Sequence, residues 1–445
     1  MEVLGDVRQG RFAEHALTER LDRTRGLSPE DRNLATELVY GVLRWQNRID
    51  DVIDRCSDRP QRRMTSRIRE ILRLAMYQIL LLDRIPDHAA VDQAVTQTRA
   101  RFGARPAAFV NAILRRALRD RDSLDLPPTD DAESLARYYS HPLWLLERWL
   151  DEFGLDRTRR VLMENNRRPP LVARVNRLKT TPGELMAMWK AEGVEVEPVA
   201  FLADALLVTA AGRPVHALPG YRKGLFVIQD SASQMIAPLL GVRPGDRVLD
   251  ACAAPGGKTS HLGALGSNRL EIVAVDIDSG RLEDTKNNLQ RLGVRGVNLV
   301  QGDASDPDFV RKLGSFDRIL VDAPCTNLGV LRRNPEAKYR TTPDAPADFA
   351  RLQSAMLAAV APALKPGGVL VYSVCTVSRE ETRQVAEEFI QKHADHVILP
   401  IEPEELPVPE LATGSGFFST FPPPSVPRDT GLLDGFFAAR STRRA

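Results

Sequence analysis

The chain has 445 residues, more than one domain usually contains, so we expect several domains. Its hydrophobic share of 43% and charged share of 27% are typical of a soluble globular protein and exclude a fibrous or disordered chain. The net charge of +2 does not by itself indicate a nucleic-acid partner. No run reaches the roughly 18 apolar residues that span a membrane. Four cysteines without metal-site or disulfide spacing, and no secretory signal, predict a cytoplasmic protein without a membrane partner or metal site.

Residues 1–130 are predicted to form an all-helical domain, because leucine, isoleucine and valine recur there at helical spacing. Ser28-Pro29-Glu30-Asp31 has the cap residue and the following proline of a helix N-terminus. Six arginines within residues 59–73 accompany a single acid, Glu70. This stripe is either a solvated helix face or a surface that binds phosphates, and the sequence favours neither.

Residues 141–220 predict a small α+β module. Strand-like runs cover residues 170–176, 193–199 and 205–209. Thr181 and Glu184 have the spacing of a capping box, which predicts a helix between the first two runs. The module lies in sequence between the helices and the segments that carry the chemistry.

From residue 221 to residue 445, strand-like and helical segments alternate, which predicts a doubly wound parallel sheet. Ligands bind such sheets at the carboxyl ends of the strands, and acids close three of these strands at Asp250, Asp276 and Asp322. Strands are expected at residues 247–251, 271–276, 297–301, 318–322 and 368–374, and helices at 257–266, 279–292, 346–364 and 378–392.

Residues 248–259 have the pattern of a strand, a turn of small residues and a helix start. The pair Gly256-Gly257 lets a ligand approach the backbone, but the spacing matches neither a Walker loop nor GxGxxG. Asp276 is placed to accept from ribose hydroxyls, and Asp303 from an adenine amino group. This ordered set favours S-adenosylmethionine over a dinucleotide, with a generic sheet that has acidic strand ends as the alternative.

Two cysteines, Cys325 and Cys375, each follow a predicted strand. Carbon 5 of cytosine becomes nucleophilic when a thiolate adds to carbon 6. That reaction needs a reactive thiolate, an acid near ring nitrogen 3 and a base for the carbon 5 proton. The chain supplies two thiols and Asp322. A single cysteine after a strand is usually a buried small residue, but two cysteines, each at a predicted strand end next to a cofactor-like sheet, favour a reactive site.

These segments resemble the motifs of the Sun/Fmu family of RNA cytosine-carbon-5 methyltransferases, over nearly the whole chain. The segments that carry the resemblance are 250–258, 275–276, 302–303, 322–325 and 373–376. The resemblance implies a multidomain protein. It would have an all-α, NusB-like RNA-binding domain at 1–130 and a small α+β, RNA-recognition-like module at 141–220. A Rossmann-like class I methyltransferase domain of α/β type would fill 221–445.

The resemblance also implies a role for each site residue. Cys375 would attack carbon 6, and Cys325 would assist product release as a base or through one. Asp322 would hold the cytosine, and Lys258 would reach the same pocket. Contacts to S-adenosylmethionine are implied for Cys252, Ala253, Ala254, Pro255, Gly256, Gly257, Lys258, Asp276, Asp303 and Asp322. RNA contacts are expected from Arg62, Arg63, Arg67, Arg332 and Arg333. Residues 229–234 would form part of the site wall, and residues 434–437 would close the far edge of the sheet.

The implied activity is methylation of carbon 5 of a cytosine in 16S ribosomal RNA by a monomer. Its partner would be the RNA or the assembling small subunit. The same chemistry on tRNA, and a non-catalytic RNA-binding factor on the same fold, are alternatives. The chain departs from the family pattern after each cysteine. Residues 326–329 include Asn327 where relatives carry smaller residues, and residues 376–381 lack an asparagine that relatives often place between two acids.

Overall fold

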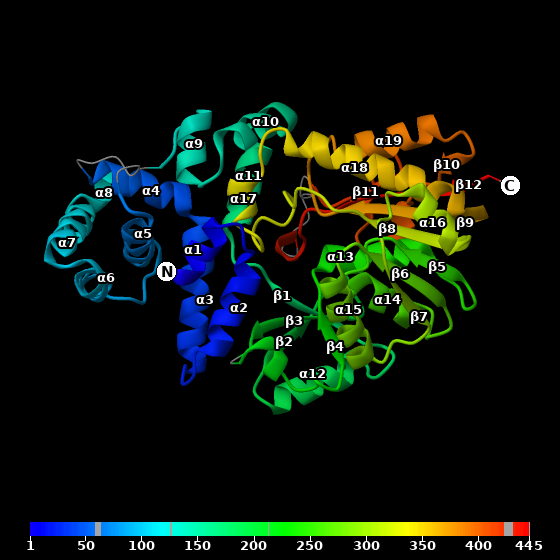
Figure 1. Ribbon diagram of the computed structural model, residues 1–445, viewed down its shortest axis with the longest axis horizontal. Coiled ribbons are helices and arrows are strands. Elements are labelled where there is room, and N and C mark those ends of the chain that lie inside the picture. Colours follow the sequence, from blue (N-terminus) through cyan, green and yellow to red (C-terminus); the bar gives the residue numbers. More distant parts are fainter. Residues whose placement is uncertain (58–63, 125–126, 212, 422–429, 445) are drawn as a thin grey trace. The chain divides into compact units, whose positions relative to one another are not determined.

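The computed structural model describes residues 1–57, 64–124, 127–211, 213–421 and 430–444. The chain divides into two compact units. The helical unit consists of Met1–Arg168 and Leu331–Arg340, and the sheet unit of Pro169–Val330 and Thr341–Ala445. Figure 1 colours the elements of both units in chain order. In the described ranges, no helix is long and apolar enough to cross a membrane.

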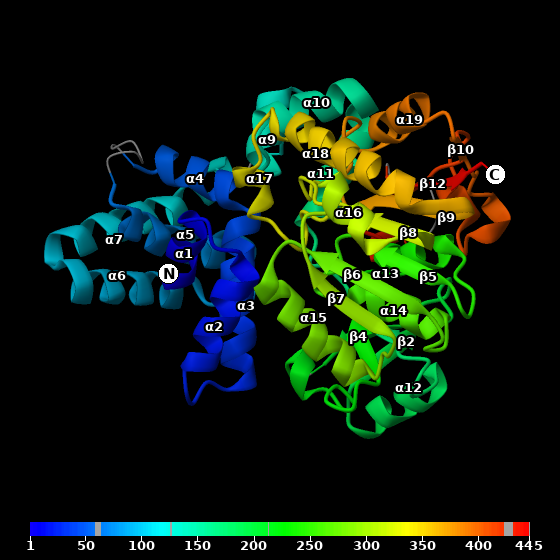
Figure 2. The same ribbon diagram turned by 45° about the vertical axis from the view of Figure 1, so that its right-hand side comes forward.

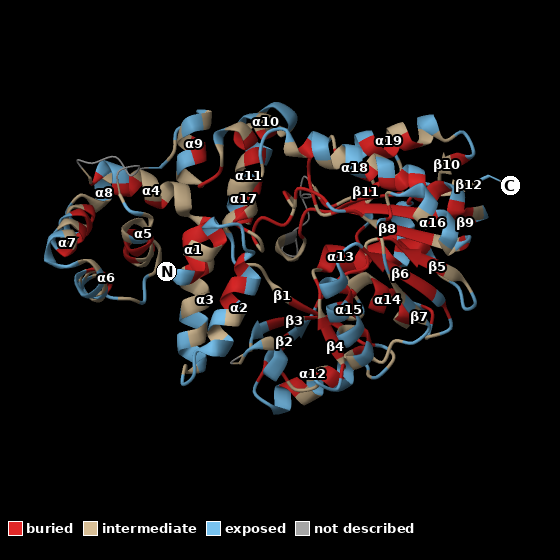
Figure 3. Cartoon of the chain, viewed as in Figure 1, coloured by how far each residue is buried: buried red, intermediate tan, exposed pale blue. Residues whose placement is uncertain are grey.

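The helical unit is built around the apolar faces of α1 to α7, which form one core and are red in Figure 3. α3 begins behind Ser28, whose hydroxyl accepts from the Asp31 N–H while the Asp31 carboxylate accepts from the Ser28 N–H. This capping box confirms the predicted helix start. The helices are α1 Glu2–Arg8, α2 Ala13–Arg23, α3 Pro29–Arg44, α4 Gln46–Arg55, α5 Ser66–Leu81, α6 Asp87–Phe102, α7 Ala104–Arg119, α8 Arg121–Leu124, α9 Ala132–Tyr138, α10 Leu143–Phe153, α11 Leu155–Asn166 and α17 Ala337–Arg340.

Residues Leu331–Arg340, called the inserted segment from here on, lie in the helical unit although they come from the middle of the sheet unit's sequence. Lys338 of this segment is fully buried. Its Nζ donates to the backbone oxygens of Arg44 at 3.2 Å and Ser140 at 3.3 Å, and to Asn166 Oδ1 at 2.9 Å. Burial lowers the pKa of Lys338 well below its ordinary value. Three acceptors from three parts of the helical unit therefore fix the inserted segment in place.

The sheet unit contains a small antiparallel sheet with strand order β2-β3-β1-β4. Its elements are β1 Leu171–Val175, α12 Pro182–Ala191, β2 Glu195–Pro198, β3 Ala205–Ala210 and β4 Phe226–Ile228. α12 begins at the predicted capping box of Thr181 and Glu184. The Trp189 ring packs edge-on against Phe226 at 4.9 Å between centroids. Asn176 Nδ2 donates to the Leu292 carbonyl at 2.7 Å, which joins this sheet to α15.

The large sheet has the order β10-β12-β9-β8-β5-β6-β7, with β11 paired to β12. Strands β9, β8, β5, β6 and β7 are parallel, and β12 and β10 continue the sheet antiparallel. The strands are β5 Arg247–Asp250, β6 Glu271–Asp276, β7 Val297–Gln301, β8 Phe316–Asp322, β9 Leu364–Val374, β10 His396–Ile398, β11 Phe418–Ser419 and β12 Phe437–Arg443.

Helices cover both faces of the large sheet (Figures 1 and 2). Side chains alternate along β8, so that Ile319 and Val321 join the core under α18 and α19, while Leu320 joins the core under α13 and α14. The helices are α13 Ser231–Ile236, α14 Gly257–Leu265, α15 Ser279–Leu292, α16 Pro307–Leu313, α18 Ala345–Val360 and α19 Arg383–Lys392. Burial on both faces explains the continuous apolar runs of the central strands.

The structure corrects three expectations about this sheet. It is mixed rather than wholly parallel, because β12 runs antiparallel to β9. Residues 434–437 do not close an edge, since β10 lies beyond β12. The last helix begins at Arg383 rather than at residue 378. The residues before Arg383 form a turn in which the Glu381 side chain is buried.

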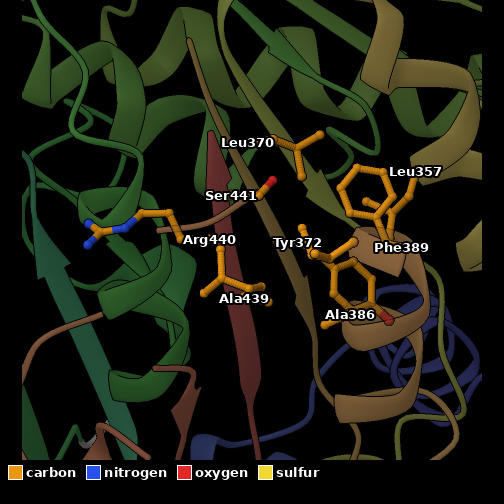
Figure 4. A pocket seen from close by; sticks show the side chains of 10 residues that line it. Leu357, Leu370, Tyr372, Ala386, Phe389, Ala439, Arg440 and Ser441 are labelled. Carbon is orange, nitrogen blue, oxygen red and sulfur yellow. The ribbon is translucent and has the colours of Figure 1, made fainter. Parts of the chain in front are cut away.

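The layer between the sheet and α18 and α19 is closely packed. A cavity of about 10 Å³ lies there, lined mainly by apolar side chains together with Tyr372, Arg440 and Ser441 (Figure 4). This volume has room for about one water molecule, which excludes it as a substrate site. Ser441 Oγ is buried without a hydrogen-bond partner among the described residues, so a single water there has one polar group to bind.

Candidate active site

The predicted site residues lie at the carboxyl ends of β5, β6, β7, β8 and β9. β5 pairs in parallel with β6 and with β8, and β7 lies beyond β6. Asp322 at the end of β8 is in register with Ser373 of β9. The carboxyl end of the parallel strands therefore carries the cofactor loop, the acids Asp276 and Asp303, and the turns that contain Cys325 and Cys375. Ligands bind parallel sheets at this end of the strands.

The predicted cofactor loop, residues 251–258, turns from β5 into α14. Gly256 has a φ of +90°, a conformation that glycine adopts without strain. Asp276 is buried, and its carboxylate accepts from the Ala254 N–H at 3.3 Å and the Asp278 N–H at 3.1 Å. The acid therefore holds the loop in place. Arg281 Nη1 lies 3.5 Å from the same carboxylate.

Two neighbours of the loop complete this side of the site. Asp303 is exposed, and its Oδ1 accepts from the backbone N–H and the hydroxyl of Ser305, which fixes the carboxylate. Ile277 directly follows Asp276 and is 65% exposed, unusually open for a large apolar side chain. The sequence interpretation missed Ile277. The sequence feature that could have identified it is an apolar residue immediately after the acid that ends a strand.

Asp322 and Lys258 form an ion pair in which Nζ and Oδ2 lie 2.5 Å apart. The Ser373 hydroxyl donates to the other oxygen of Asp322 at 2.7 Å. The Lys258 ammonium also lies 5.3 Å from the centre of the Phe436 ring, a distance at which a cation is attracted to an aromatic face. The side chains of Asp322 and Lys258 are 27% and 11% exposed. Their partners thus fix a carboxylate at the edge of the site.

The two predicted reactive cysteines lie side by side. Cys325 Sγ and Cys375 Sγ are 3.4 Å apart, and Cys375 Sγ is 3.0 Å from Asn327 Oδ1. Hydrogen bonding to Cys375 and burial raise the pKa of the Cys325 thiol well above its ordinary value, and the charges of Cys375 and Glu381 act in the same direction. Burial, together with nearby carboxylates, also raises the pKa of Cys252 well above its ordinary value. Both of these thiols therefore hold their protons.

Asn327 is a site residue whose position the sequence did not reveal. Its φ of +60° is a left-handed conformation that asparagine tolerates better than most residues. That turn places its carboxamide beside both sulfurs. The departure from the family pattern at this position was visible in the sequence, but its contact with the thiols depends on the turn.

Asp250, at the end of β5, gives a prediction for pH-dependent stability. Burial raises the pKa of this carboxyl to about 6, although the Thr259 hydroxyl donates to it at 2.7 Å. Between about pH 4 and 6 the folded state therefore keeps a proton that the unfolded chain loses. Stability should fall with rising pH in this window. Relative to Asp250→Asn, the free energy of unfolding should drop by about 2–3 kcal/mol.

Urea unfolding of both proteins at pH 4, 5 and 6 measures this difference. Asp284→Asn, which changes an exposed acid on α15, serves as the control and should follow the unsubstituted protein. Parallel stability curves for the unsubstituted protein and Asp250→Asn would show that the carboxyl is ionised throughout the window.

The arginines predicted to contact RNA have different surroundings. Arg62 and Arg63 lie outside the described residues. Arg67 is exposed on α5. In the inserted segment, Arg332 is only 4% exposed and Arg333 is half-buried, so contact between Arg332 and RNA would require its guanidinium to become accessible. Their contacts with RNA remain predictions.

Comparisons with known proteins cover the same three regions. Residues 237–441 match the family described as 16S rRNA methyltransferase RsmB/F. Residues 1–119 match the NusB family, and residues 141–216 match the ferredoxin-like domain of RsmF/B-like methyltransferases. The three-part fold expected from the sequence is thereby confirmed.

Curated relatives match over most of their length. The probable ribosomal RNA small subunit methyltransferase B of Synechocystis is 34% identical over 401 residues, 90% of each chain. The probable enzyme of the same name from Bacillus subtilis is 35% identical, over 89% of this chain and 88% of the relative. The Escherichia coli O7:K1 ribosomal RNA small subunit methyltransferase B is 36% identical, over 88% of this chain and 90% of the relative.

Solved structures agree with these matches. The structure titled "Crystal Structure of PH0851" superposes with a TM-score of 0.83 at 25% identity, over 99% of this chain and 96% of the other. NSun6 from Pyrococcus horikoshii, solved with the compound abbreviated SFG, has a TM-score of 0.58 at 25% identity, over 68% of this chain and 98% of the other. From its sequence matches and its fold, this chain belongs to the RsmB/F family of 16S rRNA methyltransferases.

Proposed function

We propose that this protein transfers a methyl group from S-adenosylmethionine to carbon 5 of a cytosine in 16S ribosomal RNA. The observation that carries the proposal is the pair of sulfurs, 3.4 Å apart, at the sheet edge that also holds Asp322 and the cofactor loop. Methylation of cytosine at carbon 5 requires a thiol nucleophile, a group to hold the ring and a route for the carbon 5 proton. The names of the curated relatives support ribosomal RNA as the substrate.

The residues along this edge fit S-adenosylmethionine. The buried Asp276 carboxylate suits a pair of ribose hydroxyls, and the exposed Asp303 carboxylate suits an amino group. Ile277 offers an exposed apolar surface beside Asp276 that a purine ring would cover. The loop from Cys252 to Lys258 would hold the amino-acid end of the cofactor, and Asp322 would contact the same end. When bound, the cofactor supplies an electrophilic methyl group.

Cys375 would act first, by adding its thiolate to carbon 6 of the cytosine. Addition converts the ring to an enamine, which makes carbon 5 electron-rich and able to take up the methyl group. Asp322, held by Lys258 and Ser373, would bind the polar edge of the ring and keep carbon 6 next to the sulfur. Because the carboxylate already has two partners, binding would cost little reorganisation.

Cys325 would act second, in product release. The hydrogen bond and the charge of Cys375 both hold the proton on Cys325, and both effects vanish once Cys375 is bonded to carbon. Burial still favours the protonated thiol, but without these two effects Cys325 would release its proton to water, and the resulting thiolate would take the proton from carbon 5. Elimination of Cys375 follows and restores the aromatic ring. The two thiols would thus act in different steps, Cys375 in the addition to carbon 6 and Cys325 in the removal of the carbon 5 proton.

Asp276 supplies a test of the cofactor site. Asp276→Asn should weaken S-adenosylmethionine binding about ten- to a hundred-fold, since hydrogen bonds to a charged acceptor contribute about 1.5–3 kcal/mol. Isothermal calorimetry measures the affinity without RNA. Glu271→Ala, at the opposite end of β6, is the matched control and should bind like the unsubstituted protein. Equal affinity in Asp276→Asn would place the ribose elsewhere.

The substrate can be identified by bisulfite sequencing. Ribosomal and transfer RNA from cells with and without the gene are compared, and a cytosine in 16S RNA should lose protection when the gene is absent. Loss confined to a tRNA would contradict the proposed substrate. Unchanged RNA, together with no cofactor binding, would favour a non-catalytic RNA-binding protein.

The proposal assigns RNA binding to the helical residues 1–130 and to the small module at 141–220, and methyl transfer to residues 221–445. Of the predicted RNA contacts that the structure describes, Arg67 is the exposed one, and its guanidinium is therefore accessible to a phosphate. The protein would act in the cytoplasm as a monomer on the RNA or on the assembling small subunit.

A further inference from the structure

Glu381 is a buried carboxylate for which neither the family resemblance nor the proposed reaction accounts. It follows Cys375 by six positions, lies between β9 and α19, and has no exposed surface. Its oxygens accept from the Thr326 N–H at 2.8 Å, the Thr326 hydroxyl at 2.5 Å and the Thr376 hydroxyl at 3.1 Å. Gln353 Nε2 adds a fourth donor at 3.3 Å. All four donors are neutral.

These donors connect the two cysteine turns. Thr326 directly follows Cys325, and Thr376 directly follows Cys375. The two threonine hydroxyls also lie 2.8 Å from each other. Because both threonines bind one carboxylate, the backbone after each cysteine is held to the same point. A change at that point would move the two sulfurs relative to each other.

A second layer supports the carboxylate. Gln353 of α18 is fully buried, and its Nε2 also donates to the Pro324 carbonyl at 2.9 Å. The Tyr372 hydroxyl lies 2.9 Å from Gln353 Oε1 and 2.5 Å from the Glu381 carbonyl. The network therefore binds the backbone on both sides of Cys325, at Pro324 and at Thr326. Figure 4 shows Tyr372 among the tightly packed side chains of this layer.

The chemistry of the group fits this role. Burying a carboxylate among neutral donors is costly compared with burying an apolar side chain. In return, it provides two oxygens that accept several hydrogen bonds from two separate turns at once, which no apolar or singly accepting group does. Satisfied buried polar networks of this kind hold one arrangement of a site.

We propose that Glu381 is a positioning residue that sets the separation of the Cys325 and Cys375 sulfurs by clamping Thr326 and Thr376. It acts through the two turns and touches neither substrate nor cofactor. Its effect on catalysis rests on the proposed function, because there the two sulfurs act on the same cytosine in successive steps. Its effect on the distance between the two sulfurs does not depend on RNA and can be measured in the free protein.

Diamide oxidation tests the geometry directly. Diamide takes two electrons and two protons from the thiol pair, becomes a hydrazine and leaves a Cys325–Cys375 disulfide. Peptide mapping by mass spectrometry follows this product over time in the free protein. The unsubstituted protein should form the disulfide readily. Glu381→Ala should slow its formation about ten-fold or more, because a misplacement of about 1 Å costs up to about a hundred-fold in an oriented reaction.

Two variants separate the clamp from general stability. Glu381→Gln keeps the size but only one of the two accepting oxygens, so its disulfide rate should lie between those of the unsubstituted protein and Glu381→Ala. Glu387→Ala removes an acid on α19 that pairs with Arg383, and should behave like the unsubstituted protein. Thermal melting identifies any variant that does not fold. If Glu381→Ala is unfolded, Thr376→Val, which removes one of the four donors, replaces it and should slow the disulfide by a smaller factor.

Activity assays give the second readout. In Glu381→Ala, kcat for methyl transfer should fall about ten- to a hundred-fold, with KM for RNA and the affinity for S-adenosylmethionine unchanged. A folded Glu381→Ala with the disulfide rate and kcat of the unsubstituted protein would overturn the proposal. If the unsubstituted protein does not methylate RNA, the proposed function fails, while the diamide result still decides the role of Glu381.

Discussion

Cys325→Ala should accumulate a covalent complex with RNA that survives a denaturing gel. In the proposed reaction Cys375 still adds to carbon 6 and carbon 5 still receives its methyl group, but the group that takes the carbon 5 proton is gone. General base catalysis contributes about 10²–10⁴-fold, so release should slow by about that factor. With radioactive methyl groups on the cofactor, the slowly migrating band should carry the label.

The control for this trap is the double variant Cys325→Ala with Cys375→Ala, which should give no slow band. Cys56→Ala, made in the Cys325→Ala background, is a second control. Cys56 is a buried thiol in the core of the helical unit, so its removal should leave the amount of adduct unchanged. A labelled adduct in Cys375→Ala, and none in Cys325→Ala, would reverse the roles of the two cysteines.

Cys375→Ala should abolish methyl transfer. Without a sulfur to add at carbon 6, carbon 5 stays in an aromatic ring and does not take up the methyl group. Loss of a covalent nucleophile is expected to lower the rate a thousand-fold or more, which corresponds to about 4 kcal/mol in the barrier. Incorporation of labelled methyl groups into 16S RNA under single-turnover conditions measures this loss of rate.

Cofactor binding distinguishes loss of chemistry from loss of the site. Calorimetry should show the same affinity for S-adenosylmethionine in Cys375→Ala as in the unsubstituted protein, because Cys375 lies on the β9 side of Asp322 and the cofactor loop follows β5. Cys375→Ser provides a graded comparison, since a hydroxyl has the shape but little of the nucleophilicity of a thiol. Normal methylation by Cys375→Ala would remove it from the reaction.

The sequence was sufficient to predict most of the architecture. Strand ends marked by Asp276 and Asp322 were expected within a residue or so of where they lie, because short apolar runs followed by an acid have few alternatives in an alternating pattern. The helix start at Ser28 and the capping box at Thr181 were predicted correctly, since both depend on residues within four positions of each other. Local signals thus located the elements.

Features that depend on distant contacts were not predictable in the same way. Strand direction at β12 depends on pairing with β9, which no local pattern encodes. The start of the last helix was predicted too early. Residues 378–382 have a helical sequence pattern, but the Glu381 side chain binds Thr326 and the segment forms a turn instead. Proximity of the two sulfurs required the fold itself, since fifty residues separate the cysteines in sequence.

The inserted segment has a consequence for the order in which the protein is made. The helical unit lacks α17, and the buried Lys338 that binds Arg44, Ser140 and Asn166, until residues 331–340 have been synthesised. At 5–20 residues per second, that is on the order of ten to thirty seconds after Arg168 has been added. The helices at the N-terminus therefore emerge first but are completed late, after strands β5 to β8 of the large sheet have been synthesised and before β9 to β12.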